Sequence, residues 1–269
     1  MKNQIIGLVR FSYLSKNGFR SESKNREETR DALYAKERMD FRFRMVERLC
    51  IRSMQKQTDQ DFKLIFLVGL DMPTVYLNRL KELIAPLPQA DIVTQPRQWM
   101  VQATQAAFKK VIDPGADYVT TFRIDDDDAV AVDYIAQTRQ QLAKLISAGM
   151  AEEPTVLAYT SGVHWEVEKK AKGLVLRSEA TPLGLACAII TKPDLPVSVF
   201  RWDHRRFGSY FPTFLVPNEV MYIRTLHKYN DSRKQLDKKV ERLSSDEMAD
   251  VLRKRFQMNF EDFEHFDNA

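Results

Sequence analysis

Four consecutive aspartates, Asp125 to Asp128, have the clearest chemical potential in this chain of 269 residues. Carboxylates so close together raise one another's pKa unless a cation compensates their charge. Oxygen ligands of this kind suit Mg²⁺ or Mn²⁺, usually beside substrate phosphates that complete the coordination shell. The run therefore predicts a site for Mn²⁺ or Mg²⁺, and an acidic surface turn is the alternative interpretation.

The segments on either side of the aspartates favour the metal site. Residues 118–124 have the composition of a buried β-strand and run directly into Asp125, while Asp133 suits the N-cap of a following helix. In open α/β sheets, ligands bind outside the carboxyl ends of the strands. The aspartates fall at such an end, which favours a functional role over a surface turn.

The chain upstream alternates short apolar runs with amphipathic stretches, a pattern that predicts βα units and a mainly parallel sheet. From Arg38 to Gln57, apolar residues recur at steps of three and four, the spacing of one helical face. The polar stretch Lys16 to Glu37 predicts a surface loop that is mobile without ligand and orders over a bound one. The other predicted elements are strands at residues 5–11, 62–68 and 90–94, and helices after Pro73 and at residues 98–112.

The strict alternation of strands and helices ends after residue 150, and we predict a mixed arrangement of strands beyond it. We predict a single domain over residues 1–269 with an α/β fold: a Rossmann-type, mainly parallel sheet flanked by helices, with a mixed second half. The elements predicted in that half are strands at residues 155–161 and 183–191, a charged hairpin at 164–176, a helix at 218–229 and a capping box at 244–247.

Composition excludes several classes of protein. Hydrophobic residues make up 44% and charged residues 29%, as in ordinary globular domains, and the nine glycines form neither a GxGxxG nor a P-loop motif. Cys50 and Cys187 lack the paired spacing of zinc or redox sites. A net charge of +4 is low for a nucleic-acid-binding protein. Because the sequence has no long apolar run, we expect a cytoplasmic protein. Contact with the inner face of the membrane and the oligomeric state are left open.

Four segments of the chain resemble a known family. RFSYL (10–14), LYAKERMDFRF (33–43), SMQKQTDQDF (53–62) and RIDDDDAV (123–130) are similar to segments of the bacterial family of putative rhamnosyltransferases. That family in turn resembles the GT-A glycosyltransferases, which carry a DXD motif. The resemblance covers nearly the whole chain and is strongest from residue 10 to residue 134.

The resemblance implies a GT-A-like fold and a metal-dependent glycosyltransferase. Residues 1–135 would form the half that binds a nucleotide-sugar donor, and residues 136–269 the half that faces a bacterial glycan or glycolipid acceptor. The sugar would be rhamnose, as the family name says. The alternatives are a metal-dependent phosphotransferase or phosphohydrolase and a non-catalytic nucleotide-sugar-binding protein. Phosphoryl-transfer enzymes of that kind would be expected to carry a DxDx[TV] motif, but Ala129 and Val130 follow the aspartates here.

Residue by residue, the DXD motif falls on Asp125 and Asp127, of which the first would contact the donor and the last would bind the metal. Asp126 remains a candidate donor contact and Asp128 a candidate metal ligand. Arg123 would contact phosphate or form a salt bridge to the aspartates. The end of the first strand, with Arg10, Phe11 and Tyr13, resembles the place where GT-A folds stack the nucleobase, although Phe11 equally suits a core position.

The resemblance also implies a metal-binding histidine and a catalytic base in the second half. His204, within the basic cluster Arg201 to Arg206, is the candidate that would complete the metal sphere; an exposed histidine is the alternative, and His164 the runner-up. The basic cluster would grip a diphosphate or form a solvated loop. Glu219, at the start of the predicted helix, is the candidate catalytic base and Asp203 the alternative. A partner of the helix dipole is the other interpretation of Glu219, and a retaining mechanism would need no such base.

Overall fold

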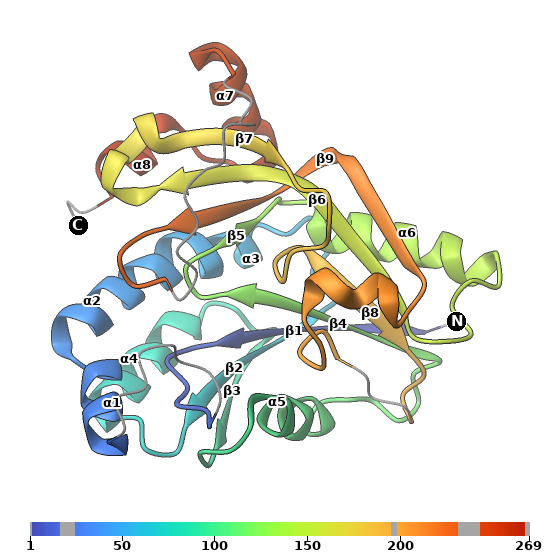
Figure 1. Ribbon diagram of the computed structural model, residues 1–269, viewed down its shortest axis with the longest axis horizontal. Helices are drawn as coiled ribbons and strands as arrows, with labels where there is room; N and C mark the ends of the chain where they lie inside the picture. Colours follow the sequence, from blue (N-terminus) through green and yellow to red (C-terminus); the bar gives the residue numbers. More distant parts are fainter. Residues whose placement is uncertain (1, 17–24, 195–197, 231–242, 267–269) are drawn as a thin grey trace.

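The computed structural model describes residues 2–16, 25–194, 198–230 and 243–266 (Figure 1). Its strands are β1 (Asn3–Arg10), β2 (Lys63–Gly69), β3 (Ala90–Gln95), β4 (Tyr118–Asp125), β5 (Ala129–Val130), β6 (Thr155–Glu166), β7 (Leu174–Ser178), β8 (Cys187–Thr191) and β9 (Thr213–Leu226). Its α-helices are α1 (Arg26–Leu33), α2 (Lys36–Met45), α3 (Arg52–Gln55), α4 (Thr74–Ile84), α5 (Met100–Lys109), α6 (Tyr134–Ser147), α7 (Ser245–Val251) and α8 (Phe260–Glu264). Tighter or wider helical turns are η1 (Val46–Ile51), η2 (Val167–Gly173), η3 (His204–Ser209) and η4 (Leu252–Phe256).

All described strands join one sheet in the order β3-β2-β1-β4-β8-β6-β9-β5, with β7 paired to β6. Its first half is parallel, as the alternating pattern predicts: β1 pairs with β2 and β4, and β2 with β3. Because β2 and β4 lie on opposite sides of β1, the strand order reverses there, and ligands of open α/β sheets bind at such a reversal. Arg10 at the end of β1 aligns with Asp125 at the end of β4.

The second half of the sheet is mixed, which confirms the predicted fold class. Strand β8 runs antiparallel to both β4 and β6, whereas β9 runs parallel to β6 and antiparallel to β5. The long β9 therefore returns to the region of β5, directly after the four aspartates. This pairing brings the end of β9, at Leu226, next to the candidate site.

The predicted helix at residues 218–229 is wrong, because these residues belong mainly to β9. The run Val220 to Thr225 is rich in β-branched and aromatic side chains, which favour a strand once a partner strand is present. Pro217, which suggested a helix start, lies instead beside an irregularity in the β6 pairing, where its carbonyl accepts a hydrogen bond from the Ser161 hydroxyl.

The predicted helix of residues 38–57 is confirmed as one continuous run, α2, η1 and α3, in which η1 is a wider π-helical turn. The predicted loop of residues 16–37 contains α1 and the start of α2, and residues 17–24 lie outside the described part, so its proposed mobility stays a prediction. The capping box at Ser244 and Glu247 is confirmed at the start of α7. No helix in the described ranges is long and apolar enough to cross a membrane.

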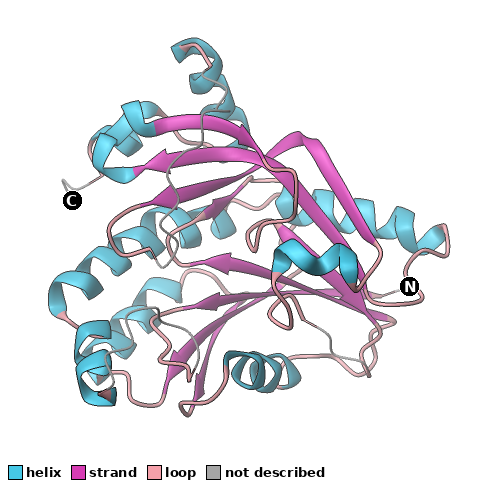
Figure 2. Cartoon of the chain, in the orientation of Figure 1, coloured by secondary structure: helices cyan, strands magenta, loops and turns pink. Residues whose placement is uncertain are grey.

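Helices cover the sheet on both faces (Figure 2). One face of the parallel half packs against α5, through Ala103, Ala107 and Phe108. The larger core includes the inward side chains of α2, η1, α4 and α6. A third cluster packs η3, through the fully buried Phe207, on β6 and β8. These layers leave the carboxyl ends of β1 and β4 as the place where charged side chains gather.

Candidate functional site

A cavity of about 310 Å³ lies at the carboxyl ends of β1 and β4, where the strand order reverses. Its walls come from both halves of the chain: the ends of β1, β4 and β9, helix α2, the segment before β8, and η3. Among the described residues that line it, six arginines stand against three aspartates, so cations outnumber carboxylates two to one. The lining residues are Arg10, Ser12, Tyr13, Arg38, Arg42, Arg123, Asp125, Asp127, Asp128, Leu183, Gly184, Leu185, His204, Arg205, Arg224, Thr225, Tyr229 and Asn230.

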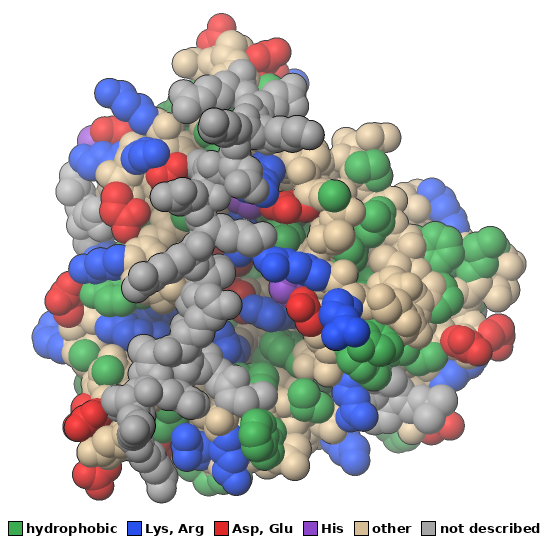
Figure 3. All heavy atoms as spheres, viewed as in Figure 1, with side chains coloured by type: hydrophobic (Ala, Val, Ile, Leu, Met, Phe, Trp, Pro, Cys, Tyr) green, Lys and Arg blue, Asp and Glu red, His purple; other side chains and the backbone are tan. Residues whose placement is uncertain are grey.

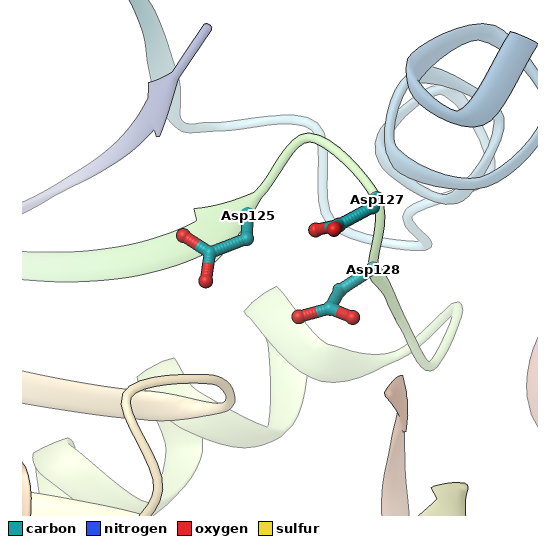
Figure 4. A group of neighbouring side chains, drawn as sticks. All are labelled: Asp125, Asp127 and Asp128. Atoms are coloured by element: carbon teal, nitrogen blue, oxygen red, sulfur yellow. The ribbon is translucent and has the colours of Figure 1, made fainter. Parts of the chain in front are cut away.

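Three of the four aspartates converge on this cavity (Figure 4). Asp125 ends β4, and Asp127 and Asp128 follow in the turn before β5; one carboxylate oxygen of each lies within 4.8 Å of the others. The turn is closed by the backbone amide of Asp128, which donates to the carbonyl of Asp125 at 3.1 Å. The arrangement joins the two aspartates of the DXD pattern to Asp128, and it leaves Asp126 outside.

Asp126 points into the protein, where Arg42 of α2 holds it. The Arg42 guanidinium donates from Nε to Asp126 Oδ2 at 2.8 Å and from Nη2 to Asp126 Oδ1, and its Nη1 reaches Asp127 Oδ2 at 2.8 Å. All three side chains are nearly inaccessible to solvent. Asp126 does not line the cavity, and its ion pair with Arg42 anchors the turn, so its contact with a donor stays a prediction.

Asp127 is the most heavily hydrogen-bonded aspartate. Its Oδ2 atom accepts from Arg42, lies 2.9 Å from Nε2 of His227 and also accepts from Asn230 at 3.3 Å. The backbone amide of Tyr229 donates to Nδ1 of His227, so the His227 proton sits on Nε2 and points to Asp127. Burial opposes ionisation, but the charge of Arg42 and the His227 hydrogen bond outweigh it and hold the Asp127 pKa below its usual range.

The other two carboxylates of the cluster, Asp125 and Asp128, differ in how their negative charge is balanced by neighbouring groups. Arg123 forms a two-point ion pair with Asp125, at 3.0 and 2.6 Å, which confirms the predicted salt bridge. Burial opposes ionisation of Asp125, yet Arg123 lowers its pKa. Asp128 accepts a hydrogen bond from the Thr225 amide at 2.9 Å, but no Lys, Arg or His of the described ranges forms an ion pair with it. Burial, and then repulsion by Asp127 and Asp125, raise the Asp128 pKa well above its usual value.

The predicted base-stacking strand end is only partly at the cavity. Arg10 and Tyr13 line it, whereas Phe11 is fully buried in the core against Phe43, with ring centroids 5.0 Å apart, and so occupies the core position that was its alternative interpretation. The Tyr13 hydroxyl forms its hydrogen bonds within the protein: it donates to the carbonyl of Pro96 at 2.6 Å and accepts from the Gln98 amide.

Of the histidine and base candidates of the second half, His204 lies at the cavity wall, whereas Asp203 and Glu219 do not. His204 lines the cavity but does not join the three converging carboxylates. Asp203 caps η3 through the Arg205 amide and does not line the cavity. Glu219 lies in β9, half-exposed and 3.7 Å from Arg255, and it too is absent from the cavity wall. The role of either carboxylate as the base stays a prediction.

Arg42 and His227 are the site residues that the sequence-based prediction missed. Arg42 belongs to the LYAKERMDFRF segment, whose arginines, Arg38 and Arg42, are four residues apart and so share one helical face that reaches the cavity. That spacing was the available signal. His227 follows the strand that was predicted as a helix, so its proximity to the aspartates could not be inferred from the sequence.

The fold and site together define an α/β protein with a charged cavity at the point where the strand order reverses. The chain matches the model of the family described as "Putative rhamnosyl transferase" over residues 4–239, and it belongs to that family. A search of curated proteins found no match.

Solved structures also resemble this one. TarS of S. aureus in complex with UDP-GlcNAc has 12% sequence identity and a TM-score of 0.44, over 94% of this chain and 65% of that chain. A "putative nucleotide-diphospho-sugar transferase" from Desulfovibrio desulfuricans has 12% identity and a TM-score of 0.37, over 84% of this chain and 82% of that chain. This chain thus spans somewhat less than two thirds of the TarS fragment.

Proposed function

We propose that this protein transfers a sugar from a nucleotide-sugar donor to a glycan or glycolipid acceptor and that it needs a divalent cation. The observation that carries the proposal is the convergence of Asp125, Asp127 and Asp128 within 4.8 Å on the wall of a cavity with six arginines. The family name supports rhamnose as the sugar. A cavity of about 310 Å³ falls within the size range of small-molecule sites.

The chemistry of the three carboxylates fits Mn²⁺ or Mg²⁺. They offer only oxygen ligands, which these ions prefer. Burial, and then repulsion by Asp127 and Asp125, raise the pKa of Asp128, and a bound cation would favour its ionised form. Asp125, Asp127 and Asp128 would hold the ion. A bound cation would neutralise charge on the departing nucleoside diphosphate as a Lewis acid.

The arginines supply the complementary half of the site. Arg10, Arg38 and Arg224 line the cavity beside the carboxylates, and guanidinium groups match phosphate oxygens in charge and geometry. Arg42 and Arg123 hold the carboxylates of the turn and of β4 in place. Cations that surround an anionic cluster in this way favour a ligand that brings both a diphosphate and a metal ion.

Release of nucleoside diphosphate tests the function. We expect the wild-type protein, given Mn²⁺ and a glycan acceptor mixture, to release it faster from a nucleoside-diphosphate rhamnose than from UDP-glucose or UDP-N-acetylglucosamine. Chelation by EDTA and the change Asp128→Asn should each abolish release. Asp91→Asn, on an exposed position of the edge strand β3, is the matched control and should keep it. Release that continues unchanged in EDTA would rule out the metal-dependent mechanism.

A further inference from the structure

A group of exposed arginines and aromatic rings forms the rim of the cavity on the η3 side. We call Arg201, Trp202, Arg205, Arg206 and Tyr210 the arginine-aromatic rim. Arg205 lines the cavity itself, and the other four lie within five residues of it in the chain, in η3 or close to its ends. Figure 3 shows Lys and Arg side chains gathered near the middle of this face, where Figure 1 draws the orange turn of residues 204–209.

The rim is stacked in a way that fixes two of its guanidinium groups. The rings of Trp202 and Tyr210 stack with centroids 5.5 Å apart and planes 29° from parallel. Arg201 lies over the Trp202 ring at 5.3 Å, and Arg206 lies over the Tyr210 ring at 5.7 Å. A guanidinium that rests on an aromatic face still has its in-plane N–H groups available for an anion.

The support beneath the rim is rigid. Phe207 of η3 is fully buried against β6 and β8, and Trp202 and Phe211 pack on the same cluster, with their ring centroids 4.8 Å apart. Backbone hydrogen bonds close the turn from the Arg206 amide to the Asp203 carbonyl and from the Tyr210 amide to the Phe207 carbonyl. The guanidinium groups therefore project from a packed element, which reduces the entropy lost when they bind a ligand.

Within the described ranges, no carboxylate forms an ion pair with Arg201, Arg205 or Arg206, although all three are exposed. Elsewhere, arginines such as Arg52, Arg139 and Arg253 do pair with aspartates. Three arginines without acidic partners beside one cavity form a local excess of positive charge, and charge complementarity favours an anionic ligand there.

We propose that the arginine-aromatic rim binds the acceptor and that the acceptor is an anionic glycan, with phosphate or carboxylate groups along its chain. This rests on the proposed function, because it assigns the acceptor side of the same cavity. A linear polymer whose end enters the cavity and whose chain leaves on the η3 side would bring the negative groups of the following sugars to Arg205, Arg206 and Arg201. An anionic membrane surface fits less well, because the aromatic rings of the rim stack on one another and under guanidinium groups instead of projecting as apolar anchors.

Binding of defined oligosaccharides tests the proposal. The probes are tetragalacturonate for carboxylates, a phosphorylated oligomannoside for phosphates, and maltotetraose as the neutral reference. We expect the wild-type protein to bind at least one anionic probe about tenfold or more tightly than maltotetraose, with a preference that falls as salt rises. Equal binding of all three probes would overturn the proposal.

Paired variants locate the effect. Arg201→Gln/Arg206→Gln should lose the preference, whereas Lys109→Gln/Lys110→Gln should keep it, since that pair removes the same charge from an exposed site at the end of α5. Equal loss in both variants would overturn the proposal, because it would indicate a nonspecific charge effect. Binding to phosphatidylglycerol vesicles through Arg201 and Arg206, without binding of either anionic probe, would also overturn it in favour of a membrane surface.

A separate titration with Mn²⁺ and nucleotide sugars distinguishes this proposal from the proposed function. Donor binding should be the same in both paired variants and in the wild-type protein, because Arg201 and Arg206 do not line the cavity. If no nucleotide sugar binds while the anionic probes bind through the rim, the proposed function fails and anion binding by the rim stands. If the donors bind and the probes do not, the rim proposal alone fails.

Discussion

Nε2 of His227 lies 2.9 Å from Oδ2 of Asp127, although the two residues are 100 positions apart in the chain. The contact ties the end of β9 to the turn after β4, so the second half of the protein helps to orient a carboxylate of the first half. The His227 side chain is fully buried and packs edge-on against Phe41 of α2. His227 is thus a positioning residue for Asp127.

Loss of this contact should weaken metal binding more than it weakens the fold. We expect His227→Ala to lower Mn²⁺ affinity by about tenfold or more, because partners that orient a metal ligand typically contribute that much. His227→Gln, which keeps an amide donor, should recover part of the affinity. Titration calorimetry with Mn²⁺ measures both variants. Wild-type affinity in His227→Ala would show that Asp127 needs no such support.

Arg42 should be the most important arginine for stability. Arg42→Met leaves Asp126 and Asp127 buried without their cation, and breaking a buried ion pair from one side costs about 3–5 kcal/mol of unfolding free energy. Arg52→Met is the control, because its ion pair with Asp262 is partly exposed and should contribute about 1 kcal/mol or less. Urea denaturation measures both. Equal losses in the two variants would contradict the anchoring role of Arg42.

Acid should destabilise the protein partly through His204. Burial, followed by repulsion from Arg123, lowers the His204 pKa to about 4, whereas an unfolded histidine titrates near pH 6.5. The unfolded state therefore takes up the proton first as the pH falls. Stability from the neutral imidazole is complete above about pH 6.5 and is lost between about pH 6.5 and 4.

The matching experiment compares urea midpoints of two variants over that pH window. His204→Asn should lose less stability than the wild-type protein on going from pH 6.5 to 4.5. The exposed His265→Asn is the control and should follow the wild-type curve. A wild-type pH dependence in His204→Asn would show that this imidazole titrates alike in the folded and unfolded states.

Glu219→Gln should leave turnover close to that of the wild-type protein. Glu219 lies half-exposed in β9, beside Arg255 and outside the cavity wall, so its loss should cost at most about 1 kcal/mol of stability. Initial rates at saturating donor give the measurement, with thermal unfolding as the check on the fold. A hundredfold fall in rate with donor affinity unchanged would restore Glu219 as the catalytic base.

The parts of the site that could be predicted from sequence are those formed by residues adjacent in the chain. The aspartates directly follow a strand-like run, and this proximity predicted their place at a strand end. Asp125 and Asp127 were singled out by the resemblance to the DXD motif, and their side chains converge with that of Asp128. Arg42 and His227 reach them from 84 and 100 residues away, so only the tertiary fold brings them there.

Residues 218–229 show the second limit of sequence-based prediction. A run that follows Pro217 and contains Val220, Met221 and Ile223 is compatible with a helix or a strand. The choice depends on pairing with β6 and β5, which sequence periodicity does not reveal. Phe11 was ambiguous for a similar reason, because burial against Phe43 depends on how α2 packs on the sheet.

The most direct test of the central claim is calorimetry of nucleotide-sugar binding with and without Mn²⁺. We expect a nucleoside-diphosphate sugar to bind the wild-type protein in Mn²⁺ and to bind about tenfold or more weakly in EDTA, since Asp125, Asp127 and Asp128 would hold an ion that offsets the charge of the diphosphate. This dependence should vanish in Asp128→Asn and persist in Asp91→Asn. Equal donor affinity with Mn²⁺ and EDTA, or an unchanged metal dependence in Asp128→Asn, would contradict the account.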